Sequence, residues 1–407
     1  MLEVIFSLFR DPLYKNSLFI MLSSITNAVF GFFFWMIVAQ LYSAEDVGIA
    51  TALLSSLVLI ILLSRLGFDF SIIRFFPIGD KSKIFSTSII LSTLFAIALG
   101  LIFIIGVDIF SPKLHLLKNP LYTFIFLTTI LMYSVITLTA QSFIALRKGE
   151  FYFFQTVVQA SRIIFVFFLT FFGAMGIFSS FSLAFFLSLI IAILLINRMI
   201  RFNISIDGDY IKESFRFSAG NYFANIFSFA PSQILPIMVL NLLGAESAAY
   251  YFIAFAIARL IFEIPNSISM SLFVEGSHGE SLKKNILKSC IAILGLLTPV
   301  VVFVYFFGEF ILYLFGKNYI QAFDLLRLFV ISSFFVAITY IYLSIKRVQM
   351  DLRSIVFLNG LTCVLLLTLS YFMILRFDII GIGYAWIITY FSNSLLIIYL
   401  VVKRKII

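Results

Sequence analysis

The chain has 407 residues, of which 62% are hydrophobic and only 12% are charged, and its mean hydropathy is +1.14. Soluble domains are far less apolar and far more charged, so the composition excludes an ordinary water-soluble protein, and the 53 phenylalanines exclude a disordered chain. With only two cysteines, a secreted disulfide scaffold is excluded as well. The formal net charge of +9 therefore belongs to a membrane protein with several spans.

Twelve apolar stretches are long enough to cross a bilayer as helices, because a hydrocarbon core requires about 20 residues. They cover residues 17–41, 47–67, 85–108, 121–146, 151–173, 177–197, 218–243, 247–271, 286–308, 325–347, 354–376 and 380–402. None has the alternating pattern of a membrane β-barrel strand. The sequence therefore predicts an all-α integral membrane protein with twelve transmembrane helices, the first of them a retained helix rather than a signal peptide.

The basic residues orient these spans. All but seven of the 28 Lys and Arg residues fall in loops on one side of the membrane. Five fall on the opposite side, namely Lys113, Lys118, Lys317, Arg327 and Arg376. The remaining two, Arg162 and Arg259, lie within spans. Because Lys and Arg accumulate in cytoplasmic loops, we expect a multi-pass protein of the cytoplasmic membrane with both termini in the cytoplasm. This distribution explains the positive charge without a nucleic-acid partner.

The loops between the spans carry no recognisable catalytic chemistry. They are short, and the sequence has no phosphate-binding loop of the ATPase type. The two histidines, His115 and His278, are isolated in opposite loops, so we expect no metal site. We expect no other cofactor either.

The chain contains an internal repeat. Residues 41–48 resemble residues 242–249, and both segments follow the first span of a six-span half. Because each half has an even number of spans, the two halves have the same orientation in the membrane. We therefore predict two parallel six-helix bundles around a central cavity. The N-terminal lobe would comprise residues 1–205 and the C-terminal lobe residues 206–407. Such halves suit alternating access. A duplication without functional meaning, or a chance match of helix spacing, is the alternative.

A charged pair lies inside the eighth span. Arg259 is near its centre, where a charge costs roughly 2.5–3.5 kcal/mol on insertion scales. Glu263 follows one turn later, and Asn266 extends the same helix face. Because a guanidinium matches the geometry of phosphate, we predict that Arg259 binds an anionic substrate and that Glu263 takes a coupling ion. The alternative is a purely structural ion pair between the two side chains.

Other polar residues within or beside the spans are weaker candidates for substrate contacts. They are Asn221 and Asn225 on one face of the seventh span, Asn27 in the first, Arg162 in the fifth and Arg65 at the end of the second. Amides also bond across packed helices, and basic side chains at helix ends commonly extend toward water, so structural roles remain open for all of them. Whether Arg162 faces the cavity is open too.

Several segments resemble a known family. The first half contributes residues 39–53, which read AQLYSAEDVGIATAL, and residues 63–76 around Arg65-Leu-Gly-Phe-Asp69; the second contributes Asn221-Tyr222, residues 243–250 and residues 273–277. These stretches resemble the polysaccharide-biosynthesis (O-antigen type) flippases of the multidrug/oligosaccharidyl-lipid/polysaccharide exporter superfamily. The resemblance implies two six-helix bundles forming a V around a cavity, and basic cavity residues that contact the substrate, a role for which Arg259 is the best match.

The function that this resemblance implies is flipping of a polyprenyl-pyrophosphate-linked oligosaccharide between membrane leaflets. The expected partners are this substrate, membrane lipids and polysaccharide assembly enzymes, with the transporter itself monomeric. A drug or cation antiporter of the same superfamily is the first alternative, although only Glu263 lies deep in a span. A membrane glycosyltransferase or polymerase, or a scaffold without transport, is less compatible with short loops and an intramembrane arginine.

Overall fold

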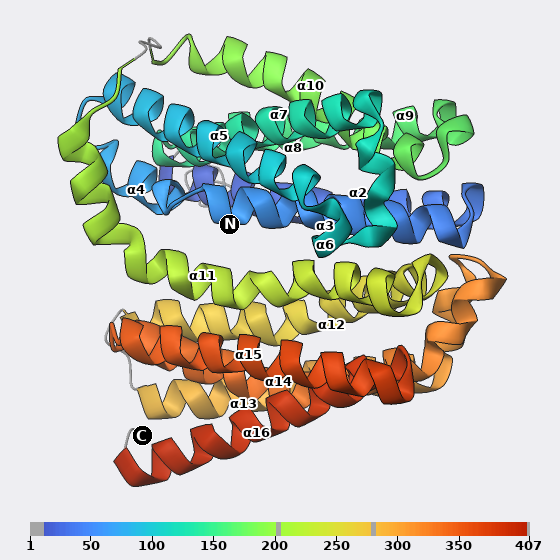
Figure 1. The fold of residues 1–407 in the computed structure, drawn as a ribbon. Helices are drawn as coiled ribbons and strands as arrows, with labels where there is room; N and C mark the ends of the chain where they lie inside the picture. The colour runs from blue at the N-terminus through green and yellow to red at the C-terminus, as the bar shows by residue number, and fades with distance from the viewer. Residues whose placement is uncertain (1–11, 201–204, 278–281, 405–407) are drawn as a thin grey trace, which may run out of the picture. The chain divides into compact units, whose positions relative to one another are not determined.

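The computed structural model describes residues 12–200, 205–277 and 282–404, and within these ranges all regular elements are helices (Figure 1). The elements of the first half are α2 (Pro12–Leu41), α3 (Ala44–Ser64), α4 (Phe68–Phe75), α5 (Lys81–Ile105), α6 (Val107–Phe110), η1 (Pro112–Lys118), α7 (Pro120–Ala145), α8 (Gly149–Gln159), α9 (Arg162–Phe168), η2 (Thr170–Phe172) and α10 (Gly173–Ile196). Those of the second half are α11 (Gly208–Leu243), α12 (Ala245–Ser277), α13 (Leu282–Tyr313), η3 (Lys317–Ala322), α14 (Phe323–Val348), α15 (Leu352–Phe377) and α16 (Ile380–Arg404).

Within the described ranges, twelve helical segments are long and apolar enough to cross a membrane, which confirms the expected number of spans. Large apolar side chains remain exposed on these helices, as Leu94 and Phe306 illustrate. Such exposure is normal where lipid tails replace water as the solvent. The all-α membrane fold class is therefore confirmed.

The second and fifth of the predicted spans differ from a single continuous helix. The second ends at Ser64, because Leu66 and Gly67 both take positive φ values (50° and 81°), and the chain then begins the short helix α4. Residues with positive φ cannot continue a right-handed helix. The fifth span consists of α8 and α9 with a turn at Ala160 and Ser161 between them. The apolar composition of a segment predicts a span but does not reveal turns within it or at its end.

The helix starts follow sequence signals. Ser43, Asp80, Asn119 and Asp351 each accept a hydrogen bond from a backbone N–H in the first turn of the following helix, at 3.0, 2.9, 3.0 and 3.2 Å respectively. These are the residue types whose short polar side chains cap helix N-termini.

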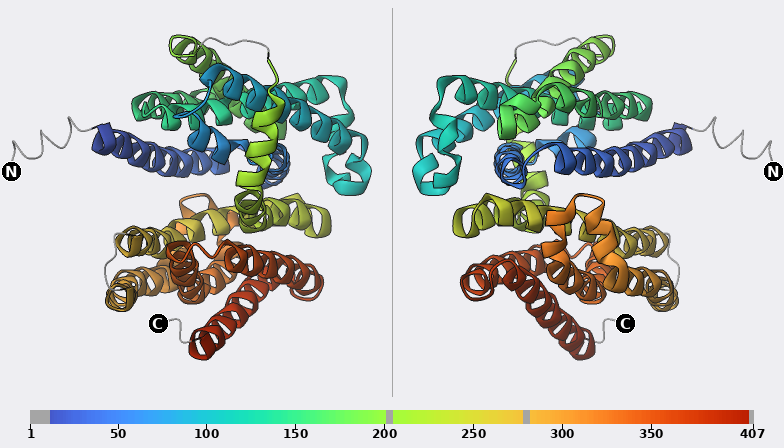
Figure 2. Two further views of the ribbon diagram at one scale, coloured as in Figure 1. Left: turned by 90° about the vertical axis from the view of Figure 1, so that its left-hand side faces the viewer. Right: turned by 90° about the vertical axis from the view of Figure 1, so that its right-hand side faces the viewer.

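The chain divides into two compact units. The first comprises residues 1–46 and 53–222, and the second comprises residues 47–52 and 223–407. Helix α11 thus contributes its first part to one unit and its second part to the other. Within each unit the long helices lie side by side, as the different views show (Figure 2). The lobe boundary expected between residues 205 and 206 stays a prediction, as does a cavity between the lobes.

Local backbone structure recurs between the two units. Arg147 and Met350 both have positive φ (56° and 54°) in the turns after α7 and α14. The same backbone bond closes each turn, from Lys148 N to Phe143 O at 2.8 Å and from Asp351 N to Lys346 O at 2.9 Å. Corresponding positions of the two halves therefore share local structure, as the internal repeat predicts.

Candidate functional site

A cavity of about 230 Å³ lies inside the second unit, between α11, α12, α14, α15 and α16. Its charged lining residues are Arg259, Glu263 and Arg347. Ser228, Ser232, Asn266, Thr339, Asn359 and Thr362 add polar groups, and Trp386, Tyr340 and Tyr390 add aromatic ones. A concave site with convergent polar groups among aromatic side chains is the usual form of a small-molecule site, so we take this cavity as the candidate site.

Helix α12 supplies the charged face that the sequence predicted. Phe255, Arg259, Phe262, Glu263 and Asn266 all line the cavity, at the spacing of one helical face. Arg259 and Glu263 form no ion pair; instead the Asn266 amide donates to the Glu263 carboxylate, with 2.9 Å between Nδ2 and Oε2. Among the described residues, the Arg259 side chain has neither a hydrogen bond nor an ion pair, and it is exposed to the cavity. The guanidinium is therefore free to bind an anion.

Arg347 is a second guanidinium in the cavity, and the sequence did not reveal it. From the sequence alone it is one of the loop charges that orient the chain, because it lies at the end of its span. Its face of α14 could have been recognised, since Val336, Tyr340, Leu343 and Arg347 are spaced as one stripe. What the sequence cannot provide is the packing of that stripe against α12.

Aromatic side chains form one wall of the cavity. Trp386 of α16 stacks on Phe262 of α12, with ring centroids 6.0 Å apart and planes inclined by 10°. Trp386 also contacts Phe329 edge-on at 5.3 Å. These contacts hold α16 against α12 and α14 and fix the indole ring at the cavity wall.

The other predicted contact of the second unit is Asn225. It is half-buried and does not line this cavity, whereas Ser228 and Ser232, one and two turns further along α11, do. Its neighbour Ala224 accepts a hydrogen bond from Asn359 at 3.1 Å, which ties α11 to α15.

Arg162 lies in the first unit, at the first position of α9. Its guanidinium carbon is 5.3 Å from the ring centroid of Phe34 and 4.7 Å from that of Phe181. Contacts of this kind stabilise a cation on aromatic faces by about 0.5–2 kcal/mol, depending on desolvation. Its buried Nε has no hydrogen-bond partner in the described part of the chain. Packing therefore accounts for much of Arg162's environment, and a role in substrate binding stays a prediction.

Arg65, Asn27 and Asn221 also belong to the first unit. Arg65 forms an ion pair with Asp69, at 3.7 Å between Nη1 and Oδ2. Asn27 is exposed on α2, and Asn221 is half-buried on α11. Their proposed contacts with substrate stay predictions.

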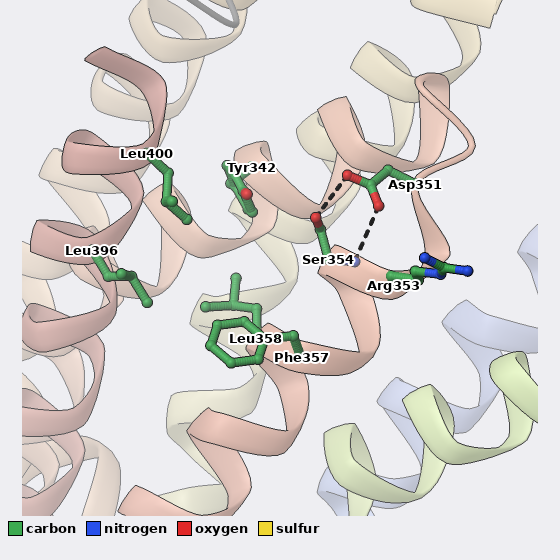
Figure 3. A pocket seen from close by; sticks show the side chains of 8 residues that line it. All are labelled: Tyr342, Asp351, Arg353, Ser354, Phe357, Leu358, Leu396 and Leu400. Carbon is green, nitrogen blue, oxygen red and sulfur yellow. Dashed lines mark hydrogen bonds between the residues drawn. The ribbon is translucent and has the colours of Figure 1, made fainter. Parts of the chain in front are cut away.

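A second cavity of about 350 Å³ lies in the same unit near the turn between α14 and α15 (Figure 3). Figure 3 shows Asp351, Ser354 and Arg353 on one side of it and Leu396 and Leu400 on the other. Asp351 accepts a hydrogen bond from the Ser354 hydroxyl at 2.6 Å and pairs with Lys346 at 3.2 Å. Its acidic group is thus already satisfied, so we do not take this cavity as the functional site.

No group of three or more His, Cys, Asp or Glu side chains that could hold a metal ion occurs among the described residues. His278 of the sequence-based expectation lies outside them. His115 contacts the backbone carbonyl of Pro112 at 3.2 Å.

Comparison with known proteins identifies the family. Residues 13–273 match the family model described as "Polysaccharide biosynthesis protein". This chain belongs to that family. A putative O-antigen transporter of Shigella flexneri is 25% identical over 218 residues, which is 51% of this chain and 52% of the relative. The chain thus matches about half the length of this curated relative.

Solved structures confirm the fold. The lipid II flippase MurJ, in an inward closed conformation, superposes with a TM-score of 0.75 at 14% identity, over 94% of this chain and 87% of MurJ. A multidrug resistance MATE family transporter of the MOP superfamily, in its inward-facing conformation, gives a TM-score of 0.72 at 14% identity, over 93% and 95% of the two chains. Both solved structures are transporters by name, and the likeness to them shows that this chain has their fold.

Proposed function

We propose that this protein is a flippase that moves polyprenyl-pyrophosphate-linked oligosaccharide across the cytoplasmic membrane by alternating access. The observation that carries the proposal is the unpaired Arg259 in a cavity that also contains Arg347. Two guanidinium groups outnumber the one carboxylate of the cavity, Glu263. Because Arg binds phosphate through a planar pair of donors, this balance favours a diphosphate over a cationic drug.

The aromatic wall suits the other part of such a substrate. Trp386, Tyr390 and Tyr340 offer flat apolar faces next to hydroxyl and amide groups, which is the combination that a sugar ring requires. Family membership and the O-antigen transporter relative support the same substrate class.

In the proposed cycle both termini are cytoplasmic, two six-helix lobes alternate around a central cleft, and Glu263 takes the coupling ion. The lipid tail remains in the bilayer while the head group passes through the cleft. The transporter acts as a monomer beside polysaccharide assembly enzymes. The excess of basic residues in one set of loops supports the orientation.

Vesicle transport tests this function against the antiporter alternative. Proteoliposomes are loaded in parallel with a polyprenyl-pyrophosphate oligosaccharide carrying a fluorophore and with a fluorescent cationic dye. The proposal predicts faster movement of the lipid-linked sugar than in protein-free vesicles and no gradient-driven movement of the dye. Dye transport without lipid-linked sugar transport would favour the antiporter.

A further inference from the structure

A carboxylate is buried at a helix joint of the first unit, outside the spans. Asp69 is the second residue of α4, only 7% of its surface is accessible, and α4 follows the positive-φ turn at Leu66 and Gly67. Burying an ionised carboxylate is costly unless charge and hydrogen bonds compensate it. The contacts of Asp69 therefore decide whether it remains ionised.

Those contacts are incomplete. The backbone N–H of Phe70 donates to Oδ1 at 3.1 Å, and the guanidinium of Arg65 approaches Oδ2 only to 3.7 Å. The buried Nε of Arg65 has no hydrogen-bond partner among the described residues. Burial raises the pKa of the Asp69 carboxyl, and the nearby Arg65 offsets only part of this effect.

The first part of α11 is fixed to this joint on both sides of Asp69. The Ser214 hydroxyl donates to the Ser71 hydroxyl at 2.6 Å, and the Tyr222 hydroxyl donates to the Leu63 carbonyl at 2.7 Å. Between them, Ser218 lies so close to Gly67 that a Cβ there would collide with it. Beyond Tyr222, α11 continues into the second unit. The joint thus anchors the helix that connects the two units.

Among the residues that the structure describes, few titratable groups face Asp69. Arg65 from the end of α3 and Tyr222 from α11 interact with it electrostatically. Tyr210, also from α11, stacks on Phe68 and hydrogen-bonds with Ser88. The surrounding α5 and α7 contribute the apolar side chains of the core cluster, Ile84, Phe85, Ile89, Leu138 and Phe143. Asp69 is the carboxylate among these described groups, so we assign proton uptake at this joint to Asp69.

We propose that Asp69 is a proton-binding site that controls how firmly the first part of α11 is held against α3 and α4. When Asp69 is ionised, the buried charge weakens the joint; when a proton from the aqueous phase binds a carboxylate oxygen, the joint no longer buries that charge. The docked state then binds more protons than the undocked state, whose Asp69 has an ordinary pKa. Docking therefore strengthens as the pH falls through the raised pKa, and it levels off below the ordinary pKa of an aspartate.

Amide hydrogen exchange of the full-length protein in lipid nanodiscs tests this inference, with rates corrected for the intrinsic effect of pH. The amides of residues 211–222 report docking of α11. In wild type their protection is expected to increase on acidification, by up to about tenfold per pH unit within the titration. Asp69→Asn should give protection that is independent of pH and close to the acidic wild-type level. Glu213→Gln, which removes an exposed carboxylate from the same part of α11, should behave as wild type.

Protection in wild type that does not change with pH, or an unchanged slope in Asp69→Asn, would overturn the proposal. Arg65→Met provides an independent test if Asp69→Asn does not fold. Without the guanidinium, the ionised form of Asp69 loses its only cationic partner in the described chain. The pH midpoint of the change in amide protection must therefore move to higher pH. An unmoved midpoint would show that another group titrates.

Discussion

The side-chain amide of Asn266 donates a hydrogen bond to the carboxylate of Glu263, with 2.9 Å between Nδ2 and Oε2, on the face of α12 that also carries Arg259. This bond gives Glu263 a neutral partner on its own helix. No ion pair joins Glu263 to Arg259, and the guanidinium of Arg259 lines the cavity without a hydrogen bond or ion pair among the described residues.

Removing this guanidinium should impair transport. We expect Arg259→Ala to lower the initial rate of flipping by roughly 10- to 100-fold, because a hydrogen bond to a charged group contributes about 1.5–3 kcal/mol. Arg259→Lys should retain part of the rate, since it keeps the charge but loses the planar pair of donors. Arg376→Ala is the matched control, because Arg376 is exposed on α15 and does not line the cavity. A wild-type rate in Arg259→Ala would show that Arg259 has only a structural role.

Arg259 and Arg347 should act on the same ligand. Binding of a polyprenyl diphosphate to wild type, to Arg259→Ala, to Arg347→Ala and to the double variant forms a thermodynamic cycle. We expect a coupling free energy of about 1 kcal/mol, because groups that contact one ligand do not contribute additively. Calorimetry in detergent micelles measures the binding free energy of each variant. Strictly additive losses of binding free energy would show that the two arginines do not act on the same ligand.

Glu263 should couple transport to an ion gradient. Glu263→Gln keeps an oxygen that can accept from Asn266, so we expect a folded protein. Flipping by this variant should lose its response to an imposed proton or sodium gradient while the basal exchange of lipid between leaflets continues. Glu309→Gln, an exposed carboxylate of α13, serves as the control. A response equal to that of wild type would exclude Glu263 as the coupling site.

Lys346 is buried in the second unit at the turn position that the fully buried Phe143 occupies in the first. Its Nζ donates to Gln349 at 2.9 Å and pairs with Asp351 at 3.2 Å. Lys346→Met should lower the free energy of unfolding by about 1–3 kcal/mol. The loss is smaller than for a fully buried ion pair, because the carboxylate of Asp351 is partly exposed and can be hydrated by water once Lys346 is removed. Adding Asp351→Asn should restore much of the loss, and denaturant unfolding in micelles measures both.

The same turn has a predictable pH dependence. The Ser354 hydroxyl, together with its backbone N–H and Lys346, lowers the pKa of Asp351. A lowered pKa in the folded state means that the stabilisation is present above the ordinary aspartate pKa and is lost as the pH falls through the folded value. In Asp351→Asn this loss on acidification should be absent. An identical acid dependence in both proteins would contradict the assignment.

Two glycines at corresponding places make close backbone contacts. A Cβ at Gly176 would collide with the carbonyl of Leu169, and one at Gly381 would collide with that of Met373. Gly176→Ala and Gly381→Ala should each cost about 1–3 kcal/mol of stability, as overpacking does. Gly295→Ala, with open space around its Cβ position, should be neutral or slightly stabilising. Equal thermal stability of all three variants would contradict these contacts.

The membrane fold was predictable because it depends on composition along the chain. Apolar length predicts the spans, and the helical spacing of Arg259, Glu263 and Asn266 predicts their common face. Arg347 and Trp386 were not predictable as cavity residues, because they reach α12 only through the packing of α14 and α16. Similarly, no sequence period shows that Phe34 and Phe181 flank Arg162, or that the positive φ of Leu66 ends α3.

The most direct test of the central claim is a flipping assay in proteoliposomes. A fluorescent polyprenyl-pyrophosphate oligosaccharide is incorporated in both leaflets, and a membrane-impermeant reagent quenches the outer one. With the wild-type protein we expect nearly complete loss of fluorescence, since flipping continually exposes the inner pool, and a much slower second phase with Arg259→Ala. Fluorescence that stops near half in wild-type vesicles, as in protein-free ones, would contradict the proposed function.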